Sequence, residues 1–101
     1  MNRSIRYHPL FERDLREAAN WYDRRSPGLG EVFIDIAEHC AADVIADPER
    51  FAQSFGGCRY IRLPRFPYIL LFDVVDDELL MLGVLHTARS IEKWRERQQS
   101  I

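Results

Sequence analysis

The chain has little cysteine, almost no lysine and no long apolar run. Only Cys40 and Cys58 are cysteines among the 101 residues, and neither lies in a CxxC pair. Both have apolar neighbours, so we expect reduced, buried thiols in a cytoplasmic protein rather than a disulfide framework. No apolar run reaches the roughly 18 residues that a membrane helix needs, and no apolar stretch follows the charged start. We therefore expect neither a membrane span nor a signal peptide.

Motifs that indicate a cofactor or a metal are also missing. The sequence contains no P-loop, no dinucleotide-binding glycine pattern, no nucleophile elbow and no metal-ligand spacing. His8 and His39 have no partners at motif spacing, and we assign them no function. We expect no cofactor and no metal site.

What is present is the composition of one small folded domain. Apolar residues make up 47% and charged residues 30% of the chain, which is ordinary for a globular protein and argues against disorder. A chain of this length buries roughly two-thirds of the surface that its unfolded form exposes, enough for a modest core. We expect a single domain over residues 1–101.

Charge is distributed unevenly along the chain. The net charge is −2, which argues against a protein whose whole surface attracts nucleic acid. Every basic residue except Lys93 is arginine, the side chain suited to bidentate contact with carboxylate or phosphate. Between residues 48 and 72 the only acidic residue is Glu49, and the basic residues are Arg50, Arg59, Arg62 and Arg65. The sequence therefore predicts a local arginine patch.

The first half of the chain predicts one strand followed by two helices. Alternating apolar and polar residues indicate a short strand over Ser4–Tyr7. His8-Pro9 should open a helix with proline at the first helical position, and apolar residues follow at helical spacing to Tyr22. Ser26-Pro27-Gly28 should end it, and a second amphipathic helix should stop at Asp47-Pro48. So short a joint predicts an antiparallel helical hairpin.

The second half changes to strands. Three apolar runs predict strands at Cys58–Leu63, Phe66–Val75 and Glu78–His86, the last two joined by a tight turn. Prolines on either side of Arg65-Phe66 predict a bend or bulge between the first two. A short charged helix over Ile91–Gln99 should follow. The predicted fold class is α+β in the order β-α-α-β-β-β, a helical hairpin packed on an antiparallel sheet with a C-terminal helix.

The last two predicted strands are apolar on both faces. A half-solvated antiparallel sheet alternates apolar and polar side chains, and one helical hairpin can cover only one face. We therefore expect a cover on the other face. It is either the tail helix, through Ile91 and Trp94, or a second protein chain, and the sequence leaves both open.

The candidate catalytic side chains are a histidine and several arginines. His86 ends the last strand and Arg89 follows it. If the three C-terminal strands are neighbours, these two residues are expected near Arg59, Arg62 or Arg65. The arginines would clamp a phosphodiester and stabilise developing charge, while the histidine moves a proton at a ribose or leaving oxygen. The structural alternative is a histidine that caps a backbone group and arginines on a solvated strand edge.

Several short motifs occur in an order typical of one family of small proteins. In chain order they are Tyr7-His8-Pro9, Trp21-Tyr22, Ser26-Pro27-Gly28-Leu29-Gly30, Phe33, Asp47-Pro48, Arg59, Leu63, Arg65-Phe66-Pro67-Tyr68, His86-Thr87-Ala88-Arg89 and Trp94. Their joint order over nearly the whole chain resembles the RelE/ParE family of toxins, the plasmid stabilisation proteins. The resemblance implies a compact toxin of a type II toxin–antitoxin system, held inactive by a cognate antitoxin.

The resemblance also implies two different targets. RelE-like members cleave messenger RNA at the ribosome with clustered basic residues and often a C-terminal tyrosine, whereas ParE-like members lack that set and poison DNA gyrase. Here Lys93 is the only lysine, no tyrosine follows Tyr68 and the net charge is negative. Because phosphate contacts dominate affinity for RNA, we favour the ParE-like interpretation, a gyrase inhibitor rather than an enzyme. The alternatives are a ribosome-dependent endoribonuclease with His86, Arg59 and Arg89 as catalytic residues, and a non-toxic protein that only binds a partner.

The surface that binds the target or the antitoxin should combine arginines with aromatic side chains. We expect an antitoxin segment to order on binding and to lay apolar side chains on exposed sheet or hairpin surface. Arg59 and Arg65 are the best candidates for pairing with acidic antitoxin residues. The candidate contact residues are Arg59, Arg62, Arg65, Tyr68, Arg89 and Trp94.

Overall fold

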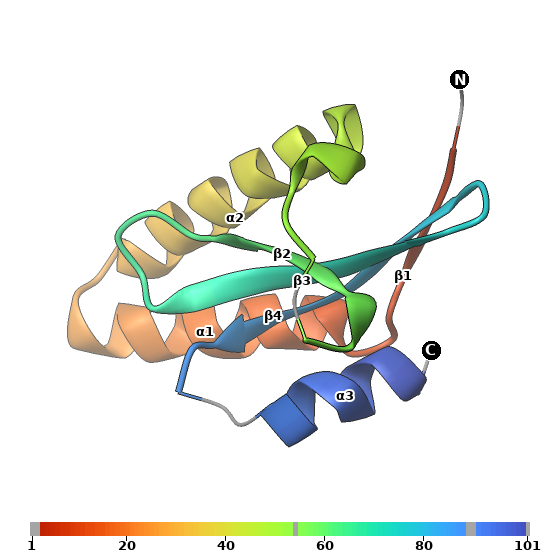
Figure 1. Cartoon of the computed structure of the whole chain (residues 1–101). Coiled ribbons are helices and arrows are strands. Elements are labelled where there is room, and N and C mark those ends of the chain that lie inside the picture. The colour runs from red at the N-terminus through yellow and green to blue at the C-terminus, as the bar shows by residue number, and fades with distance from the viewer. Residues whose placement is uncertain (1–2, 54, 89–90, 101) are drawn as a thin grey trace.

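The chain forms a helical hairpin, a four-stranded sheet and a C-terminal helix, as the computed structural model in Figure 1 shows. The structure describes residues 3–53, 55–88 and 91–100. The predicted order and α+β class are confirmed. In chain order the elements are β1 (Ser4–Tyr7), α1 (Phe11–Arg25), α2 (Leu29–Ala46), the short 3-10 helices η1 (Pro48–Arg50) and η2 (Phe55–Gly57), β2 (Arg59–Arg62), β3 (Tyr68–Val75), β4 (Glu78–His86) and α3 (Ile91–Gln99).

The sheet is mixed, and the expectation of a purely antiparallel sheet is wrong. Its strand order is β1-β4-β3-β2, and β1 runs parallel to β4 with Ser4 opposite Glu78 and Tyr7 opposite Met81. The other two pairs are antiparallel, as predicted. Alternation of side chains indicates a strand but not its direction, because both kinds of ladder have the same side-chain period. The long connection from β1 to β4 allows the parallel direction, because parallel neighbours need a long crossover.

Helix α1 begins two residues later than predicted, at Phe11 instead of Pro9. The preceding residues form a turn in which the carbonyl of His8 accepts the N–H of Phe11 at 2.9 Å. The ring nitrogen Nδ1 of His8 accepts the N–H of Leu10 at 3.0 Å. The first N–H groups of a helix have no partner within the helix and need other acceptors. His8 supplies two such acceptors, its carbonyl and its ring nitrogen, and the turn they hold precedes the helix.

Irregular backbone separates the C-terminal strands. The predicted bend between β2 and β3 is confirmed: Arg65 has a φ of 72°, and Tyr68 donates its N–H to the carbonyl of Phe66 at 2.8 Å. A bulge that the sequence did not indicate lies between β3 and β4, where Leu71 faces Gly83 but Phe72 faces Met81. The extra residue changes the side-chain alternation in the second half of β4.

Each face of the sheet carries an apolar core. Helices α1 and α2 cover one face, over fully buried residues that include Phe33 and Phe72. On the other face, α3 packs Trp94 over Tyr60 and the buried residues Cys58, Ile69, Leu71, Leu80, Leu82 and Leu85. The tail helix is therefore the cover observed on the second face (Figure 1). The predicted contribution of the Ile91 side chain lies outside the described residues.

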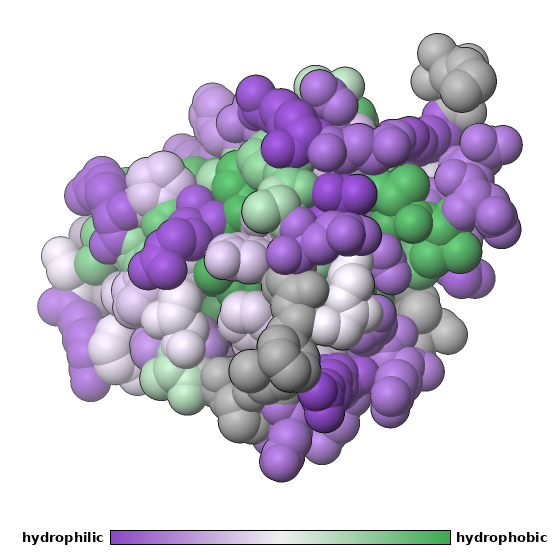
Figure 2. Space-filling view, in the orientation of Figure 1, coloured by the Kyte–Doolittle hydropathy of each residue, from purple (hydrophilic) through white to green (hydrophobic). Residues whose placement is uncertain are grey.

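On the face that Figure 2 shows, polar side chains cover most of the surface. None of the helices in the described ranges is long and apolar enough to cross a membrane. Apolar surface gathers between β1 and the end of α2, at the upper right of Figure 2.

Candidate functional site

The sheet does not bring the predicted catalytic residues together. Arg59 lies opposite Phe72, whereas His86 lies opposite Tyr68, about 13 Å further along the strands. His86 packs against Tyr68 on the hairpin face, with ring centroids 5.1 Å apart. Arg62 follows Tyr60 by two residues and therefore shares its face, the α3 face. Arg89 lies outside the described residues. The three C-terminal strands are neighbours as expected, but His86 and the arginines of β2 do not converge.

Arg59 holds a loop in place. Its Nη1 atom donates to the carbonyl of Phe51 at 2.6 Å and lies 3.5 Å from that of Glu49. These contacts tie η1 and the residues after it to the start of β2. The guanidinium is thus engaged within the fold, which leaves less of it for a phosphate or an antitoxin carboxylate.

Arg62 and Arg65 are exposed and available to a partner. Neither forms a salt bridge with another residue in the described part of the chain. Arg65 also holds a left-handed backbone conformation, which residues with a Cβ rarely adopt. These two arginines are the members of the predicted patch whose surroundings suit a contact role.

The aromatic candidates and His86 have clear packing roles. Tyr68 lies 5.0 Å from the Phe33 ring, in a cluster that also includes Tyr22. Trp94 lies 5.9 Å from Tyr60 in the second core. The Nδ1 atom of His86 accepts the N–H of Ala88 at 3.0 Å, which is the backbone-capping role considered as the structural alternative.

The strongest electrostatic contact joins α1 to α3, and sequence analysis missed it. Arg97 donates to Asp14 with both terminal nitrogens, and each side chain is less than one-tenth exposed. Arg97 also donates to the carbonyl of Leu82, and Asp14 accepts the N–H of Val84, both at 3.1 Å. Gly83 leaves the space for this pair, because a Cβ there would overlap Nη1 of Arg97. The signal in the sequence was a lone glycine inside an apolar strand.

His8 belongs to the same network. It is 5% exposed, its Nε2 lies 2.8 Å from the hydroxyl of Ser100, and its Nδ1 is already an acceptor, so Nε2 carries the proton. Burial lowers the pKa of His8, and the nearby Arg97 lowers it further, while Asp14 opposes the shift. His8 is therefore neutral in the folded protein at pH 7.

The two cysteines are free and buried, as predicted. Burial, assisted by Asp73, raises the pKa of Cys58 to about 12. Burial, assisted by Asp43, also raises the pKa of Cys40. Both thiols therefore stay protonated at neutral pH and act as packing groups. Within the described ranges, no group of three His, Cys, Asp or Glu side chains could hold a metal ion.

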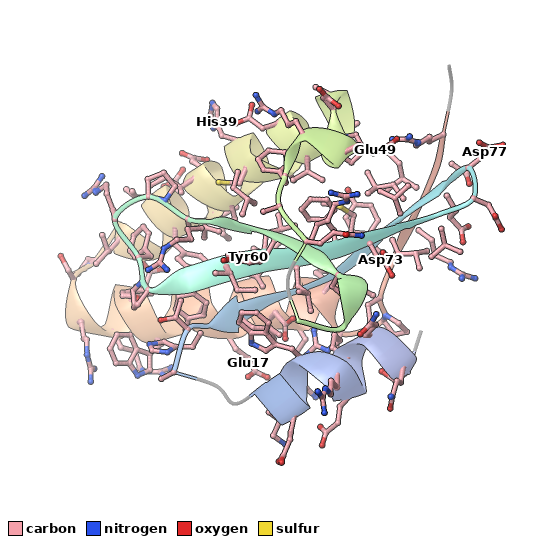
Figure 3. All side chains as sticks on the ribbon, in the orientation of Figure 1. Glu17, His39, Glu49, Tyr60, Asp73 and Asp77 are labelled. Atoms are coloured by element: carbon pink, nitrogen blue, oxygen red, sulfur yellow. The ribbon has the colours of Figure 1, made fainter. Side chains whose placement is uncertain are left out.

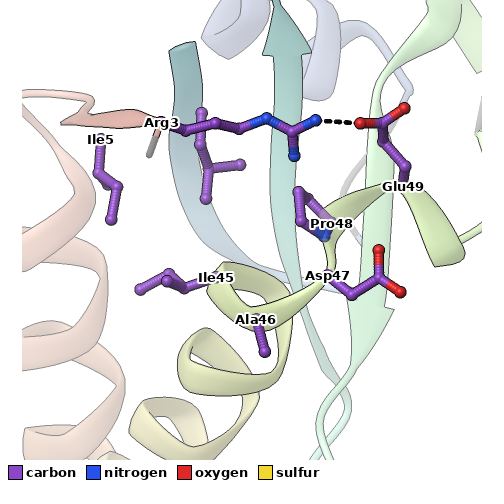
Figure 4. A pocket seen from close by; sticks show the side chains of 8 residues that line it. Arg3, Ile5, Ile45, Ala46, Asp47, Pro48 and Glu49 are labelled. Atoms are coloured by element: carbon purple, nitrogen blue, oxygen red, sulfur yellow. Dashed lines mark hydrogen bonds and ion pairs between the residues drawn. The ribbon is translucent and has the colours of Figure 1, made fainter. Parts of the chain in front are cut away.

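A groove runs beside β1, and we call it the β1 groove. Its larger part, about 520 Å³, has Leu79 at its floor and the half-exposed Ile5 and Ile45 on its walls (Figure 4). A second hollow, about 390 Å³, lies beside α1 and α2 and shares no lining residue with the first, and we include it under the same name. The second part is lined by Tyr7, His8, Pro9, Phe11, Glu12, Leu15, Ala37, Glu38 and Ala41.

The rim of the β1 groove is acidic. Arg3 pairs with Glu49 across it, as the dashed line in Figure 4 shows. The remaining charged residues of the lining are all carboxylates: Glu12, Glu38 and Asp47. The groove thus combines an apolar floor with negative charge, whereas the sequence led us to expect arginines beside the apolar surface.

Comparison with known proteins identifies the family. The model of the "ParE toxin of type II toxin-antitoxin system, parDE" matches residues 5–91. Among solved structures, the chromosomal ParDE toxin–antitoxin system from P. aeruginosa matches with a TM-score of 0.73 and 17% identity, over 83% of this chain and 95% of that chain. This likeness supports the fold. No curated protein matches the chain. Because the family model spans most of the sequence, the chain belongs to the ParE toxin family of type II toxin–antitoxin systems.

Proposed function

We propose that this ParE-type toxin arrests growth in the cytoplasm by acting on DNA gyrase, and that a cognate antitoxin neutralises it. The observation that carries the choice of gyrase over messenger RNA is the separation of His86 from the arginines of β2. A nuclease needs its proton carrier and its phosphate clamp at one phosphodiester. The described strands place Arg59 about four residues along the sheet from His86 and Arg62 on the opposite face from His86, and Arg59 is engaged by the Phe51 carbonyl.

The charge of the molecule supports the same choice. The net charge is −2, and the exposed arginines Arg62 and Arg65 lie in the segment 48–72, in which Glu49 is the only acidic residue. A protein that binds ribosomal and messenger RNA gains most of its affinity from phosphate contacts, which this surface offers only locally. Binding to a protein target does not require positive charge over the whole surface.

For neutralisation we propose that the antitoxin docks in the β1 groove. Burying Ile5 and Ile45, now 40% and 42% exposed, would contribute hydrophobic free energy to binding. The acidic rim at Glu38 and Asp47 favours lysine or arginine on this part of the antitoxin. Acidic antitoxin residues would instead reach Arg65, so a single wrapping segment would need charges of both signs.

The experiment for toxicity is expression of residues 1–101, alone and together with the small protein encoded beside its gene. We expect growth arrest in the first case and rescue in the second. Ile45→Asp should keep toxicity but reduce rescue, since it adds another carboxylate to the groove. The matched control is Ala42→Asp, an exposed position on the same helix. Normal growth despite good soluble expression would instead indicate the non-toxic partner-binding protein.

The experiment for the target compares two purified reactions. We expect inhibition of gyrase-dependent supercoiling and no cleavage of ribosome-bound messenger RNA. His86→Ala should leave the inhibition intact, because His86 acts in packing and capping. Codon-positioned cleavage that disappears in His86→Ala at an unchanged melting temperature would establish the endoribonuclease instead.

A further inference from the structure

The outer edge of β4 is only half covered by β1. The pairing runs from Glu78 to Met81, and the last bond is donated by the N–H of His8 to the carbonyl of Met81 at 2.9 Å. From Leu82 to His86, β4 has no strand on this side among those that the structure describes. An open strand edge presents main-chain donors and acceptors to any neighbouring chain.

Among the described residues, side chains close the first part of this open edge and make no hydrogen bond to its last part. Arg97 bonds the carbonyl of Leu82, and Asp14 bonds the N–H of Val84. In an antiparallel ladder, the N–H and C=O of one residue point to the same side, and this repeats every second residue. The carbonyl of Val84 and both main-chain groups of His86 therefore point outward. No hydrogen bond to them occurs between residues in the described ranges.

A groove of about 470 Å³ lies beside these free groups, and we call it the β4 groove. One wall is α1, with Glu17, Ala18 and Trp21, and the other includes Tyr68 and His86 (Glu17 is labelled in Figure 3). Trp21 is 41% exposed, which is unusual for so large an aromatic side chain. No lining residue is shared with the β1 groove.

The β4 groove joins the features of a strand-binding site. Exposed aromatic side chains in a pocket are frequent anchors of protein interfaces. The Nε2 atom of His86 carries the proton, because Nδ1 is an acceptor, and so offers a further donor. Glu17 is 63% exposed, and among the described residues its ion pair is with Arg13 at the surface, where water screens it. Its carboxylate can therefore accept a second cation.

We propose that the β4 groove binds an extended segment of a partner protein, which adds to β4 in line with β1. The free groups of Val84 and His86 define the conformation, since an extended backbone supplies the matching donors and acceptors. The aromatic wall takes an apolar side chain, and Glu17 selects a neighbouring arginine or lysine. The Trp21 ring already carries a cation of this chain, because the guanidinium of Arg25 lies 3.7 Å from its centroid. This surface lies outside the β1 groove, and the inference does not depend on the proposed gyrase target.

The test uses the isotope-labelled full chain and two capped synthetic peptides, Thr-Val-Arg-Val-Thr-Val and Thr-Val-Glu-Val-Thr-Val, followed by NMR. We expect the arginine peptide to shift the amide signals of Ala18, Val84 and His86, and to bind at least tenfold more tightly than the glutamate peptide. A version of the arginine peptide N-methylated at alternate residues, which removes the strand donors, should lose binding. Trp21→Ala should weaken binding at least tenfold, whereas Ile45→Ala in the β1 groove should not change it.

Three results would overturn the inference. One is the absence of shifts at Val84 and His86 at millimolar peptide. Another is shifts confined to the β1 groove, around Ile5 and Ile45. A third is a dimer in sedimentation that the peptide does not compete with, since a second copy would then occupy the edge. Glu17→Gln is a second test that applies even if Trp21→Ala does not fold. It should reduce the preference for the arginine peptide while the melting temperature stays the same.

Discussion

Both faces of the sheet are buried under helices, but different kinds of contact hold α1 and α2 on one face and α3 on the other. On the hairpin face, α1 and α2 pack large side chains such as Phe33 against β3 and β4 over most of their length. On the other face, the nine-residue helix α3 is held by Trp94, by polar contacts from Arg97 and by a contact from Ser100, the residue after the helix. The helices α1 and α2 are held by apolar side chains at helical spacing, whereas α3 depends on a few residues in specific places. The predictions below probe this difference in order of expected effect.

The largest effect should come from the hairpin face. Phe33 is fully buried and contacts the rings of Tyr22, Phe66 and Tyr68. Phe33→Ala should lower the free energy of unfolding by about 4 kcal/mol, from lost transfer energy and the cavity left behind. Urea unfolding followed by circular dichroism measures it. Because this core joins both layers, the whole chain should lose stability together, and a loss confined to α3 would contradict the comparison.

The next effect concerns the ion pair beneath α3. Arg97→Ala leaves the buried carboxylate of Asp14 without its partner, which should cost about 3 kcal/mol in the free energy of unfolding. The double variant Arg97→Ala with Asp14→Asn should recover part of this loss, because the uncompensated charge is gone. Hydrogen exchange should show faster exchange first in α3 and in β4 around Leu82. Equal exchange rates across both faces would show that α3 is not held separately.

A smaller effect is expected at the glycine that makes room for the pair. Gly83→Ala places a Cβ against Arg97, and the guanidinium must shift to admit it. We expect a loss of about 1–2 kcal/mol, typical of overpacking. Gly57→Ala provides a contrast, because a Cβ there meets nothing within 4 Å and its cost comes from a backbone φ of 91° instead of from overlap. If Gly83→Ala is neutral, the space beside Arg97 is wider than the structure indicates.

The smallest effect concerns pH. Because the pKa of His8 is lowered on folding, the neutral form stabilises the folded protein. This stability is fully present above the ordinary histidine pKa and is lost as the pH falls through the lower pKa of the folded state. The free energy of unfolding, measured between pH 7.5 and pH 5, should therefore decline as the pH falls. His8→Gln should reduce this decline. Removing the exposed His39 by His39→Gln should leave the decline unchanged.

Local periodicity predicted the elements well. The strands Ser4–Tyr7 and Glu78–His86 and the helix Ile91–Gln99 have the predicted bounds, and the two-faced apolar pattern of β3 and β4 correctly required a second cover. The candidate site was harder to predict. The sequence suggested that His86 and Arg59 could lie close together, because both belong to the C-terminal strands. The register of β2, β3 and β4 separates them. Register depends on turn length and bulges, which residue types indicate only weakly.

The sequence by itself determined where strands and helices form, which apolar faces are buried, and the family to which the chain belongs. These follow from residues close together in the chain, whose spacing sets the faces of helices and strands. Only the tertiary structure decided the parallel direction of β1, the meeting of Asp14 with Arg97, and the open half of the β4 edge. The physical reason is that these features need partners distant in the chain. Their positions depend on how many strands lie side by side and on where β1 stops.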